Sequence, residues 1–264
     1  MSESRLAPAW AALRARERTA LIPYLTAGYP SAQASLAALR AADEVADILE
    51  VGVPFSDPLA DGPTIQRSTF DALRQGMTLA GTLTLIERAR LSRPVVVFSY
   101  LNPILRYGLD RFLRDADALG VAGVLLTDLP AGSDPAVESA IQASPLDLIR
   151  LIAPTTRPGR LATAVAGAQG FVYLVARLGV TGATASLAQG LEASIAQVRR
   201  ATPLPVAVGF GISTPAQART VAGLADGVVV GSALVEMLGT SGVEAARGFL
   251  VALREALDAQ AAVR

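Results

Sequence analysis

Two carboxylate side chains stand close together in an unusual sequence context. Glu50 lies near the C-terminal end of the apolar run DILEVGVP (47–54), and Asp61 lies in the proline-rich segment PFSDPLADGP (54–63). Burying an unpaired carboxylate costs free energy or forces the group to take up a proton. The pattern therefore predicts a raised pKa for Glu50, which suits a general acid near neutral pH.

Each acidic residue of this region also has a structural interpretation. Glu50 could form an ion pair with an arginine across the fold. Asp61 could cap a helix that begins at Gly62-Pro63, because Asp before Pro is a common helix start. Asp57, one residue before a proline, could form a turn. The residues alone leave these alternatives open.

Glycines gather near the C-terminal ends of the last three apolar runs, at Gly179, Gly182, Gly209, Gly211, Gly227 and Gly231. The motifs GFGIS (209–213) and VVVGSAL (228–234) each follow a predicted strand and precede a predicted helix. Backbone N–H groups at such turns, together with a helix N-terminus, bind anions without a cationic side chain. Two such turns, with Ser232 adjacent, indicate a phosphorylated small molecule.

The composition excludes several kinds of catalysis. All 23 basic residues are Arg, and the chain has no Lys, His or Cys. A lysine Schiff base, covalently held pyridoxal phosphate, a histidine base and a cysteine nucleophile are therefore impossible in this chain. Zinc–thiolate sites and iron–sulfur clusters are excluded as well, and we expect no metal. Proton transfer falls to Asp, Glu and Tyr.

Charge and hydropathy give expectations about partners and location. The formal net charge is zero and the isoelectric point is about 6.4, so we expect no nucleic-acid binding. The uncharged stretch 201–218 contains three prolines and two glycines, which argues against a membrane span there. Residues 1–18 lack the long apolar centre of a secretory signal. These features predict a cytoplasmic protein.

Short apolar runs alternate with helical segments along the whole chain. The runs are residues 21–28, 47–54, 94–100, 120–128, 146–154, 170–176, 205–211 and 225–232. Several are nearly continuous Val, Leu and Ile, which is typical of parallel strands buried on both faces. They predict an α/β fold, a single-domain (β/α)8 TIM barrel over residues 1–264, with an extra N-terminal helix at 3–17 that contains Trp10. A doubly wound open sheet is the competitor, with glycines expected after its first strand.

The segment LEVGVPFSDPLADGPTIQ (49–66) closely resembles the signature of tryptophan synthase α subunits. The similarity continues in order over essentially the whole chain, through LIPYLTAGYP (21–30), YLNPILRYG (100–108), LLTDLP (125–130), YLVARLGVTGA (173–183), GFGIS (209–213) and GSALVE (231–236). The departures are Tyr24 where some members have Phe, Val229 in place of Ile, and Thr184 where Arg or Glu is common.

The resemblance implies a (β/α)8-barrel lyase of tryptophan biosynthesis. Such enzymes cleave indole-3-glycerol phosphate to indole and glyceraldehyde 3-phosphate. They work beside a tryptophan synthase beta subunit, which receives the indole through an internal tunnel, in a heterotetramer of two alpha and two beta chains. The resemblance implies no cofactor in this chain, and pyridoxal phosphate only in the partner beta subunit.

Site residues follow from the resemblance position by position. The implied catalytic residues are Glu50, Asp61 and Tyr173. The implied phosphate-binding residues are Gly182, Gly211, Gly231 and Ser232. The implied indole pocket is formed by Phe98, Leu125, Phe210, Val229 and Ile65. Thr181 is implied in closing a mobile loop, with a hydrogen bond to Asp61 as a further hypothesis. Ordinary packing for Tyr173 and an ordinary surface loop over 177–191 are the alternatives.

The residue types present suffice for retro-aldol chemistry. Protonation of the indole ring at C3 supplies the electron sink that other aldolases obtain from lysine or a metal. We hypothesise that Glu50 protonates C3 and accepts the hydroxyl proton, that ionised Asp61 binds the ring N–H, and that Tyr173 orients the substrate or Glu50.

Three rival functions remain at this level. An isomerase of a phosphoribosyl intermediate would share the glycine turns. A non-catalytic subunit that only activates the beta chain is a second rival, and a stand-alone indole-releasing lyase is a third.

Overall fold

Eight parallel strands form a closed barrel in which each strand pairs with its sequence neighbour and β8 closes onto β1. This computed structural model describes residues 3–153, 155–175, 184–209 and 211–261, with the side chains of 184–189 excepted. The strands are β1 (Ala20–Thr26), β2 (Leu49–Gly52), β3 (Val95–Ser99), β4 (Gly123–Leu126), β5 (Asp147–Ile152), β6 (Val172–Val175), β7 (Val206–Gly209) and β8 (Gly227–Val230). The predicted (β/α)8 barrel is confirmed, and the open doubly wound sheet is wrong.

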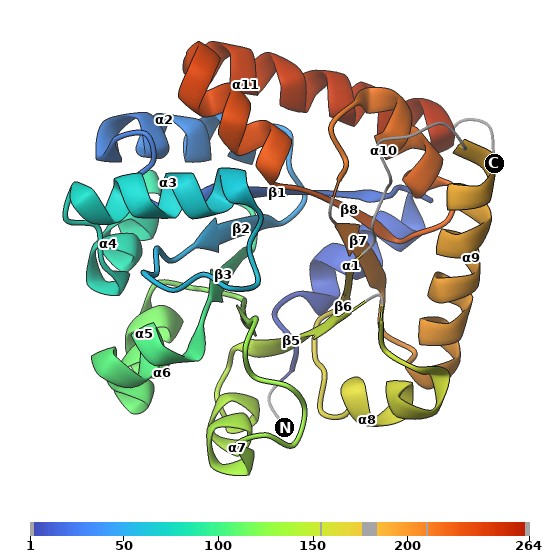
Figure 1. Ribbon diagram of the computed structural model, residues 1–264, viewed down its shortest axis with the longest axis horizontal. Coiled ribbons are helices and arrows are strands. Elements are labelled where there is room, and N and C mark those ends of the chain that lie inside the picture. Colours follow the sequence, from blue (N-terminus) through green and yellow to red (C-terminus); the bar gives the residue numbers. More distant parts are fainter. Residues whose placement is uncertain (1–2, 154, 176–183, 210, 262–264) are drawn as a thin grey trace.

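Helices surround the barrel, as Figure 1 shows. They are α1 (Ala7–Ala15), α2 (Ala32–Asp43), α3 (Pro63–Arg74), α4 (Leu79–Ala89), α5 (Leu101–Tyr107), α6 (Leu109–Ala118), α7 (Pro135–Ala143), η1 (Pro158–Arg160), α8 (Leu161–Ala164), α9 (Thr184–Ala201), α10 (Pro215–Ala222) and α11 (Ser232–Ala261). The last of these is interrupted at Gly242, which has φ +83°. Among the described residues, no helix combines the length and apolar character that crossing a membrane requires.

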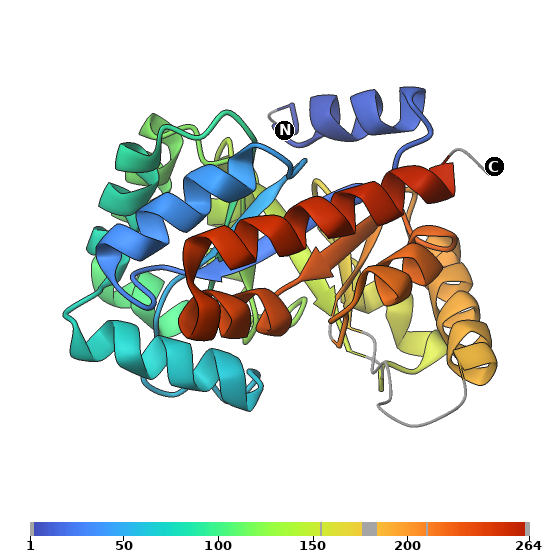
Figure 2. The ribbon, with the colours of Figure 1, turned by 90° about the horizontal axis from the view of Figure 1, so that it is seen from above.

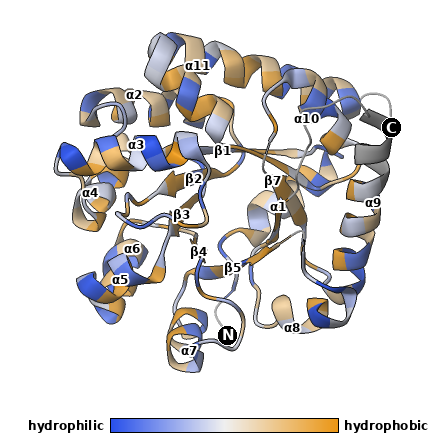
Figure 3. Cartoon of the chain, in the orientation of Figure 1, coloured by the Kyte–Doolittle hydropathy of each residue, from blue (hydrophilic) through white to orange (hydrophobic). Residues whose placement is uncertain are grey.

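Strand periodicity divides the apolar side chains between two cores. Leu49 and Val51 of β2 belong to the large core between the sheet and the helices. Ile48 lies in a second cluster inside the barrel, and Glu50 takes the next inward position. Because successive strand residues point to opposite faces, Glu50 must point into the barrel. In Figure 3 the strands are mostly hydrophobic, whereas the surrounding helices mix hydrophobic and hydrophilic residues.

The N-terminal helix lies across the end of the barrel where the strands begin (Figure 2). Trp10 of α1 packs against Phe171, which precedes β6, with 5.6 Å between ring centroids. Asp147, the first residue of β5, accepts hydrogen bonds from the Ser4 hydroxyl (2.7 Å) and the Leu6 N–H (3.1 Å). The expected extra helix is therefore present, although it is shorter than 3–17, and Trp10 is a packing residue.

Candidate active site

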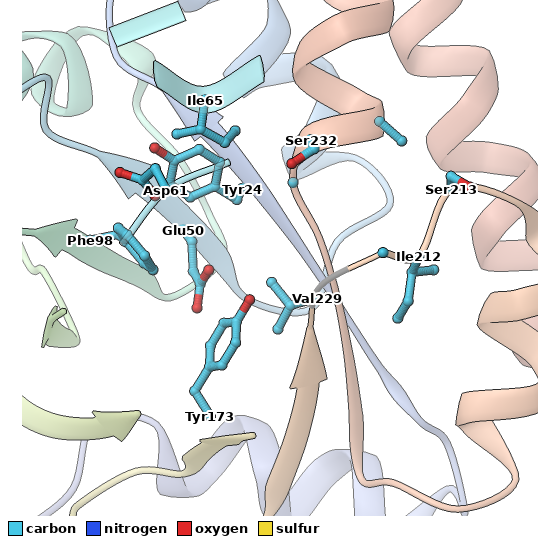
Figure 4. A pocket seen from close by; sticks show the side chains of 13 residues that line it. Tyr24, Glu50, Asp61, Ile65, Phe98, Tyr173, Ile212, Ser213, Val229 and Ser232 are labelled. Atoms are coloured by element: carbon cyan, nitrogen blue, oxygen red, sulfur yellow. The ribbon is translucent and has the colours of Figure 1, made fainter. Parts of the chain in front are cut away.

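A cavity of about 100 Å³ opens at the end of the barrel where the strands finish. Figure 4 shows the side chains that surround it. It is lined by Tyr24, Glu50, Asp61, Ile65, Phe98, Tyr173, Gly211, Ile212, Ser213, Val229, Gly231, Ser232 and Ala233. Most of the residues expected at the site from the sequence are therefore brought to one place, from strands β1, β2, β3, β6 and β8 and from the loops after β2 and β7.

Glu50 is almost completely buried, with 1% of its surface exposed. Neither carboxyl oxygen hydrogen-bonds to any of the described residues. Burial without compensation raises the pKa of Glu50 to about 8. No arginine in the described part of the chain forms a salt bridge with it, so the alternative of an ion pair across the barrel finds no support there. At neutral pH the side chain is a protonated acid inside an apolar barrel.

Asp61 is half-buried, and its carboxylate lines the same cavity. The helix-cap interpretation is wrong, because Gly62 is the N-cap of α3 and no side chain caps this helix. The carboxylate instead accepts a hydrogen bond from the Tyr100 hydroxyl (3.0 Å). Burial raises the pKa of Asp61 to about 6, and the bond from Tyr100 opposes that rise. Asp61 is therefore mostly ionised at neutral pH while Glu50 is mostly protonated.

Asp57, the other acidic residue of this segment, lies outside the cavity. It is exposed, accepts a hydrogen bond from its neighbour Ser56, and accepts the N–H of Leu59 at its own carbonyl (2.9 Å). These contacts fit the turn-forming interpretation.

Tyr173 reaches the cavity from β6, where it pairs in register with Ala207. Figure 4 shows its hydroxyl between the Glu50 carboxyl group and Val229. Burial, and then the charge of Glu50, raise the pKa of Tyr173 well above its ordinary value, so the phenol stays protonated. The side chain fits only because residue 209 is glycine: a Cβ there would lie 2.0 Å from the Tyr173 hydroxyl oxygen.

Apolar side chains form much of the cavity wall. Ile65 of α3, Phe98 of β3 and Val229 of β8 all line it. Tyr24 stands edge-on to Phe98, with 5.1 Å between ring centroids and 77° between ring planes. Leu125 lies beside Phe98 in the strand register but is fully buried and does not line the cavity. A flat aromatic ring suits this wall better than a polar group does.

One side of the cavity, away from Phe98, is built from backbone turns. Gly211, with φ +80°, follows β7, and Gly231 joins β8 to Ser232, the first residue of α11. The first N–H groups of a helix have no acceptor within the helix and carry a partial positive charge. Ser213 and Ser232 lie on this side, away from Phe98, in Figure 4. The expected phosphate residues 211, 231 and 232 thus meet at one end of the cavity.

Three further residues of the proposed site fall outside the described residues. They are Thr181, Gly182 and Phe210. Their expected roles in loop closure, phosphate binding and the indole pocket stay predictions.

Comparison with known sequences gives the family. The sequence family described as "Tryptophan synthase alpha chain" matches residues 10–261. The tryptophan synthase alpha chain of Gloeobacter violaceus is 47% identical over 253 residues, which is 94% of this chain and 92% of the relative. That of Geobacter sulfurreducens is 46% identical over 262 residues, 96% of this chain and 99% of the relative. The chain belongs to the tryptophan synthase alpha chain family.

Solved structures agree with this assignment. Tryptophan synthase of Mycobacterium tuberculosis matches with a TM-score of 0.88 at 43% identity, covering 97% of this chain and 99% of that chain. Tryptophan synthase subunit alpha of Legionella pneumophila matches with a TM-score of 0.89 at 34% identity, covering 98% and 100%. As a member of the tryptophan synthase alpha chain family, the protein is a lyase of tryptophan biosynthesis. The phosphoribosyl isomerase alternative is therefore wrong.

Several residues of the cavity are absent from the set expected from the sequence. Ile212, Ser213 and Ala233 line the cavity next to motif residues that were expected there, and their place in GFGIS and GSALVE could have indicated them. Tyr24 also lines the cavity, although the sequence marks it only as a departure from relatives. Tyr100 lies in the similar segment YLNPILRYG, but nothing in its sequence context indicates the contact with Asp61, which is 39 residues away.

Proposed function

We propose that this chain cleaves indole-3-glycerol phosphate to indole and glyceraldehyde 3-phosphate by a retro-aldol reaction. One observation carries the proposal. Two carboxyl groups share one largely apolar cavity, where burial keeps Glu50 mostly protonated near neutral pH while Asp61, with its hydrogen bond from Tyr100, stays mostly ionised. This is the pairing that acid–base cleavage beside an indole ring requires.

Glu50 is the proposed proton donor and acceptor. Its carboxyl group protonates the indole ring at C3, which turns the ring into the electron sink. The bond between C3 and the glycerol side chain then breaks, and its electrons restore the aromatic ring. The side-chain hydroxyl becomes the aldehyde as its proton passes to the Glu50 carboxylate. The proton given to C3 stays on the released indole, and the hydroxyl proton takes its place on Glu50, so Glu50 ends the cycle as it began.

Asp61 is the proposed electrostatic group. Protonation at C3 leaves positive charge on the ring, which is shared with the ring N–H. An ionised carboxylate that accepts a hydrogen bond from this N–H stabilises the charge as it develops. Tyr173, whose hydroxyl lies between Glu50 and Val229 in Figure 4, would orient the substrate or Glu50.

The glycine turns are the proposed phosphate site. The backbone around Gly211 and Gly231 and the N-terminal end of α11 at Ser232 offer N–H donors to an anion. The indole ring would then lie against Phe98, Ile65 and Val229, with Leu125 beside Phe98 on the neighbouring strand β4. Thr181, Gly182 and Phe210 are proposed to complete the phosphate and ring contacts and to close the loop over the substrate.

A tryptophan synthase alpha chain implies a beta partner chain. We propose an assembly of two alpha and two beta chains in the cytoplasm, with pyridoxal phosphate in the beta chain and no cofactor in this one. The side chains support that division, because the chain contains no lysine that could hold the cofactor. The two cavity carboxyl groups argue against a chain that only activates its partner.

Indole release tests the function. Indole formed from indole-3-glycerol phosphate should be measured with the isolated chain and again with its beta chain. We expect slow release by the isolated chain and a clear increase with the partner. No release in either case would overturn the proposal, and fast release that ignores the partner would favour the stand-alone lyase.

A further inference from the structure

Tyr100 contacts the segment that carries Asp61 at three points. It follows β3 directly and is 5% exposed. Its hydroxyl accepts the Ala60 N–H (2.9 Å) and donates to Asp61 Oδ2 (3.0 Å). Its ring packs against Phe55, with 5.0 Å between centroids and 36° between planes. One side chain thus connects the end of β3 to both ends of the loop that follows β2.

Other contacts hold the Asp61 backbone but leave its side chain free to turn. The Asp61 N–H donates to the Pro58 carbonyl (3.1 Å), and the Asp61 carbonyl accepts from Gln66 Nε2 (2.9 Å). Within the described residues, Tyr100 donates the only hydrogen bond that the carboxylate accepts. The direction of this carboxylate therefore depends on Tyr100.

The Ala60 contact fixes the direction in which Tyr100 donates. A phenol hydroxyl has one hydrogen to give, and an N–H that occupies an oxygen lone pair turns that hydrogen away from itself. The hydrogen is left pointing at Asp61. A hydrogen bond to an ionised carboxylate is stronger than one to a neutral group, so the contact favours the ionised form.

Few other groups on the surrounding strands act on the Asp61 charge. Among the described residues, the titratable side chains facing it are Glu50 of β2 and the phenols Tyr24 of β1 and Tyr173 of β6. The pKa of each phenol is raised by burial, so both stay neutral. No arginine in the described ranges forms a salt bridge with Asp61.

We propose that Tyr100 is a positioning residue for the reaction, which aims the ionised Asp61 carboxylate at the substrate ring. Tyr100 does not line the cavity and acts only through Asp61. The inference rests on the proposed function of Asp61. It adds a group that no pattern in the sequence indicates.

Replacement of Tyr100 by Phe keeps the ring and removes the hydroxyl. We expect kcat/KM at neutral pH to fall by about tenfold, since one hydrogen bond to a charged group is lost. The loss should lie in kcat more than in KM, because the charge on the ring develops in the transition state. The acid side of the pH profile, set by the Asp61 pKa, should move to higher pH.

Two comparison variants make the test specific. Tyr107→Phe removes another tyrosine–carboxylate hydrogen bond, from Tyr107 to Asp115. Tyr107 is the last residue of α5, the helix whose N-cap is Tyr100. This substitution should leave both the rate and the pH profile unchanged. In an Asp61→Asn background, Tyr100→Phe should cause little further loss, because two residues that act through one interaction are not additive.

A purely structural role gives different results. It predicts a loss that is equal at every pH, an unmoved acid limb, and a full additional loss in the Asp61→Asn background; any of these would overturn the inference. Carbon-13 NMR titration of the Asp61 carboxyl, with and without Tyr100→Phe, needs no activity. If the wild-type chain releases no indole, the proposed function fails, while an upward shift in this titration still supports the contact and an unmoved one refutes it.

Discussion

Glu50 and Asp61 lie in one cavity but differ in what surrounds them. Glu50 is enclosed by strands and finds no hydrogen-bond partner among the described residues, so burial acts on its pKa without opposition. Asp61 lies on a loop at the rim, and Tyr100 stabilises its charge. The pKa values, about 8 for Glu50 and about 6 for Asp61, differ for two reasons. Glu50 is more deeply buried, and Asp61 alone accepts a hydrogen bond, from the Tyr100 hydroxyl, among the described residues.

Replacement of Glu50 by Gln should abolish most of the turnover. The amide keeps the shape of the side chain but has no acidic proton to give to C3, and lost general acid–base catalysis costs about 10³-fold. Indole release by the isolated chain measures the effect. Asp57→Asn, which makes the same chemical change at an exposed position of the neighbouring loop, is the matched control and should stay near the wild-type rate. Near-normal turnover by Glu50→Gln would refute its role.

The same substitution should change how stability depends on pH. The pKa of Glu50 rises from 4.5 to about 8 on folding, so between these values the folded chain holds a proton that the unfolded chain has lost. The wild-type free energy of unfolding therefore falls as pH rises through this window. Because Gln has no charge to bury, the advantage of Glu50→Gln over wild type should grow by on the order of 3 kcal/mol from about pH 5 to about pH 8.

Denaturant unfolding of both proteins across this pH range provides the measurement. A constant offset between the two curves would show that Glu50 ionises in the folded state as readily as in the unfolded state. A growing offset would show that the acid is held neutral by its burial.

At the level of elements, the sequence predicts order and direction better than boundaries. Seven of the eight apolar runs contain a whole strand, and β1 begins at Ala20, one residue before its run; 31–46 and 215–224 contain α2 and α10. The strands are shorter than the runs, because apolar residues continue into the turns: β2 covers Leu49–Gly52 within the run 47–54. Hydropathy indicates which residues are buried, and residues that follow the last hydrogen bond between strands are buried as well. It therefore cannot mark where a strand ends.

Glycines at strand ends are the element-scale feature that the sequence explained least. The sequence pattern places Gly209 in an anion-binding turn. In the structure, the space where a side chain at position 209 would lie is filled by the Tyr173 hydroxyl. Gly52 likewise leaves room for Tyr24, since a Cβ at position 52 would lie 2.1 Å from the Tyr24 hydroxyl oxygen. These contacts join neighbouring strands across the barrel interior and cannot be found from the residues beside each glycine.

Replacement of Gly209 by Ala should displace Tyr173. Its Cβ would need the place of the hydroxyl oxygen, and forcing an extra carbon into a packed interior costs about 1–3 kcal/mol. We expect lower thermal stability and a loss of kcat/KM. Gly190→Ala on α9, where an added Cβ meets nothing within 4 Å, is the control and should be neutral or stabilising. Equal behaviour of the two variants would show that Tyr173 has room to move.

On the scale of the whole molecule, the segment that leads into α1 and the helix α11 are both fastened to the barrel. The N-terminal segment is held at Asp147, and Arg254 of α11 reaches Asp47 (2.8 Å) and the Thr19 carbonyl (3.2 Å) beside β1. We propose on this basis that residues 1–264 form a single domain. The sequence predicted the extra helix, but its ion pairs and hydrogen bonds link residues more than 100 positions apart and are visible only in the fold.

Replacement of Trp10 by Ala should weaken the whole barrel while sparing the cavity. Trp10 is 6% exposed and fills the space between α1, Phe171 and Gly227. Truncation of a buried aromatic side chain costs about 3–5 kcal/mol, so the midpoint of denaturation should fall clearly. Trp10→Phe should lose much less, because it keeps a ring in place. We expect the KM for indole-3-glycerol phosphate to stay unchanged in the folded Trp10→Ala variant. A changed KM would contradict the view that the α1 end of the barrel does not affect the cavity at the other end.

Trp10 is also the single tryptophan of the chain. Its fluorescence therefore comes from one known place, at the opposite end of the barrel from the cavity. The emission of the folded protein should report whether α1 is seated on the barrel and should be insensitive to Glu50→Gln or Tyr100→Phe. The chain thus carries a built-in optical probe, with which damage to the fold can be told apart from damage to the chemistry.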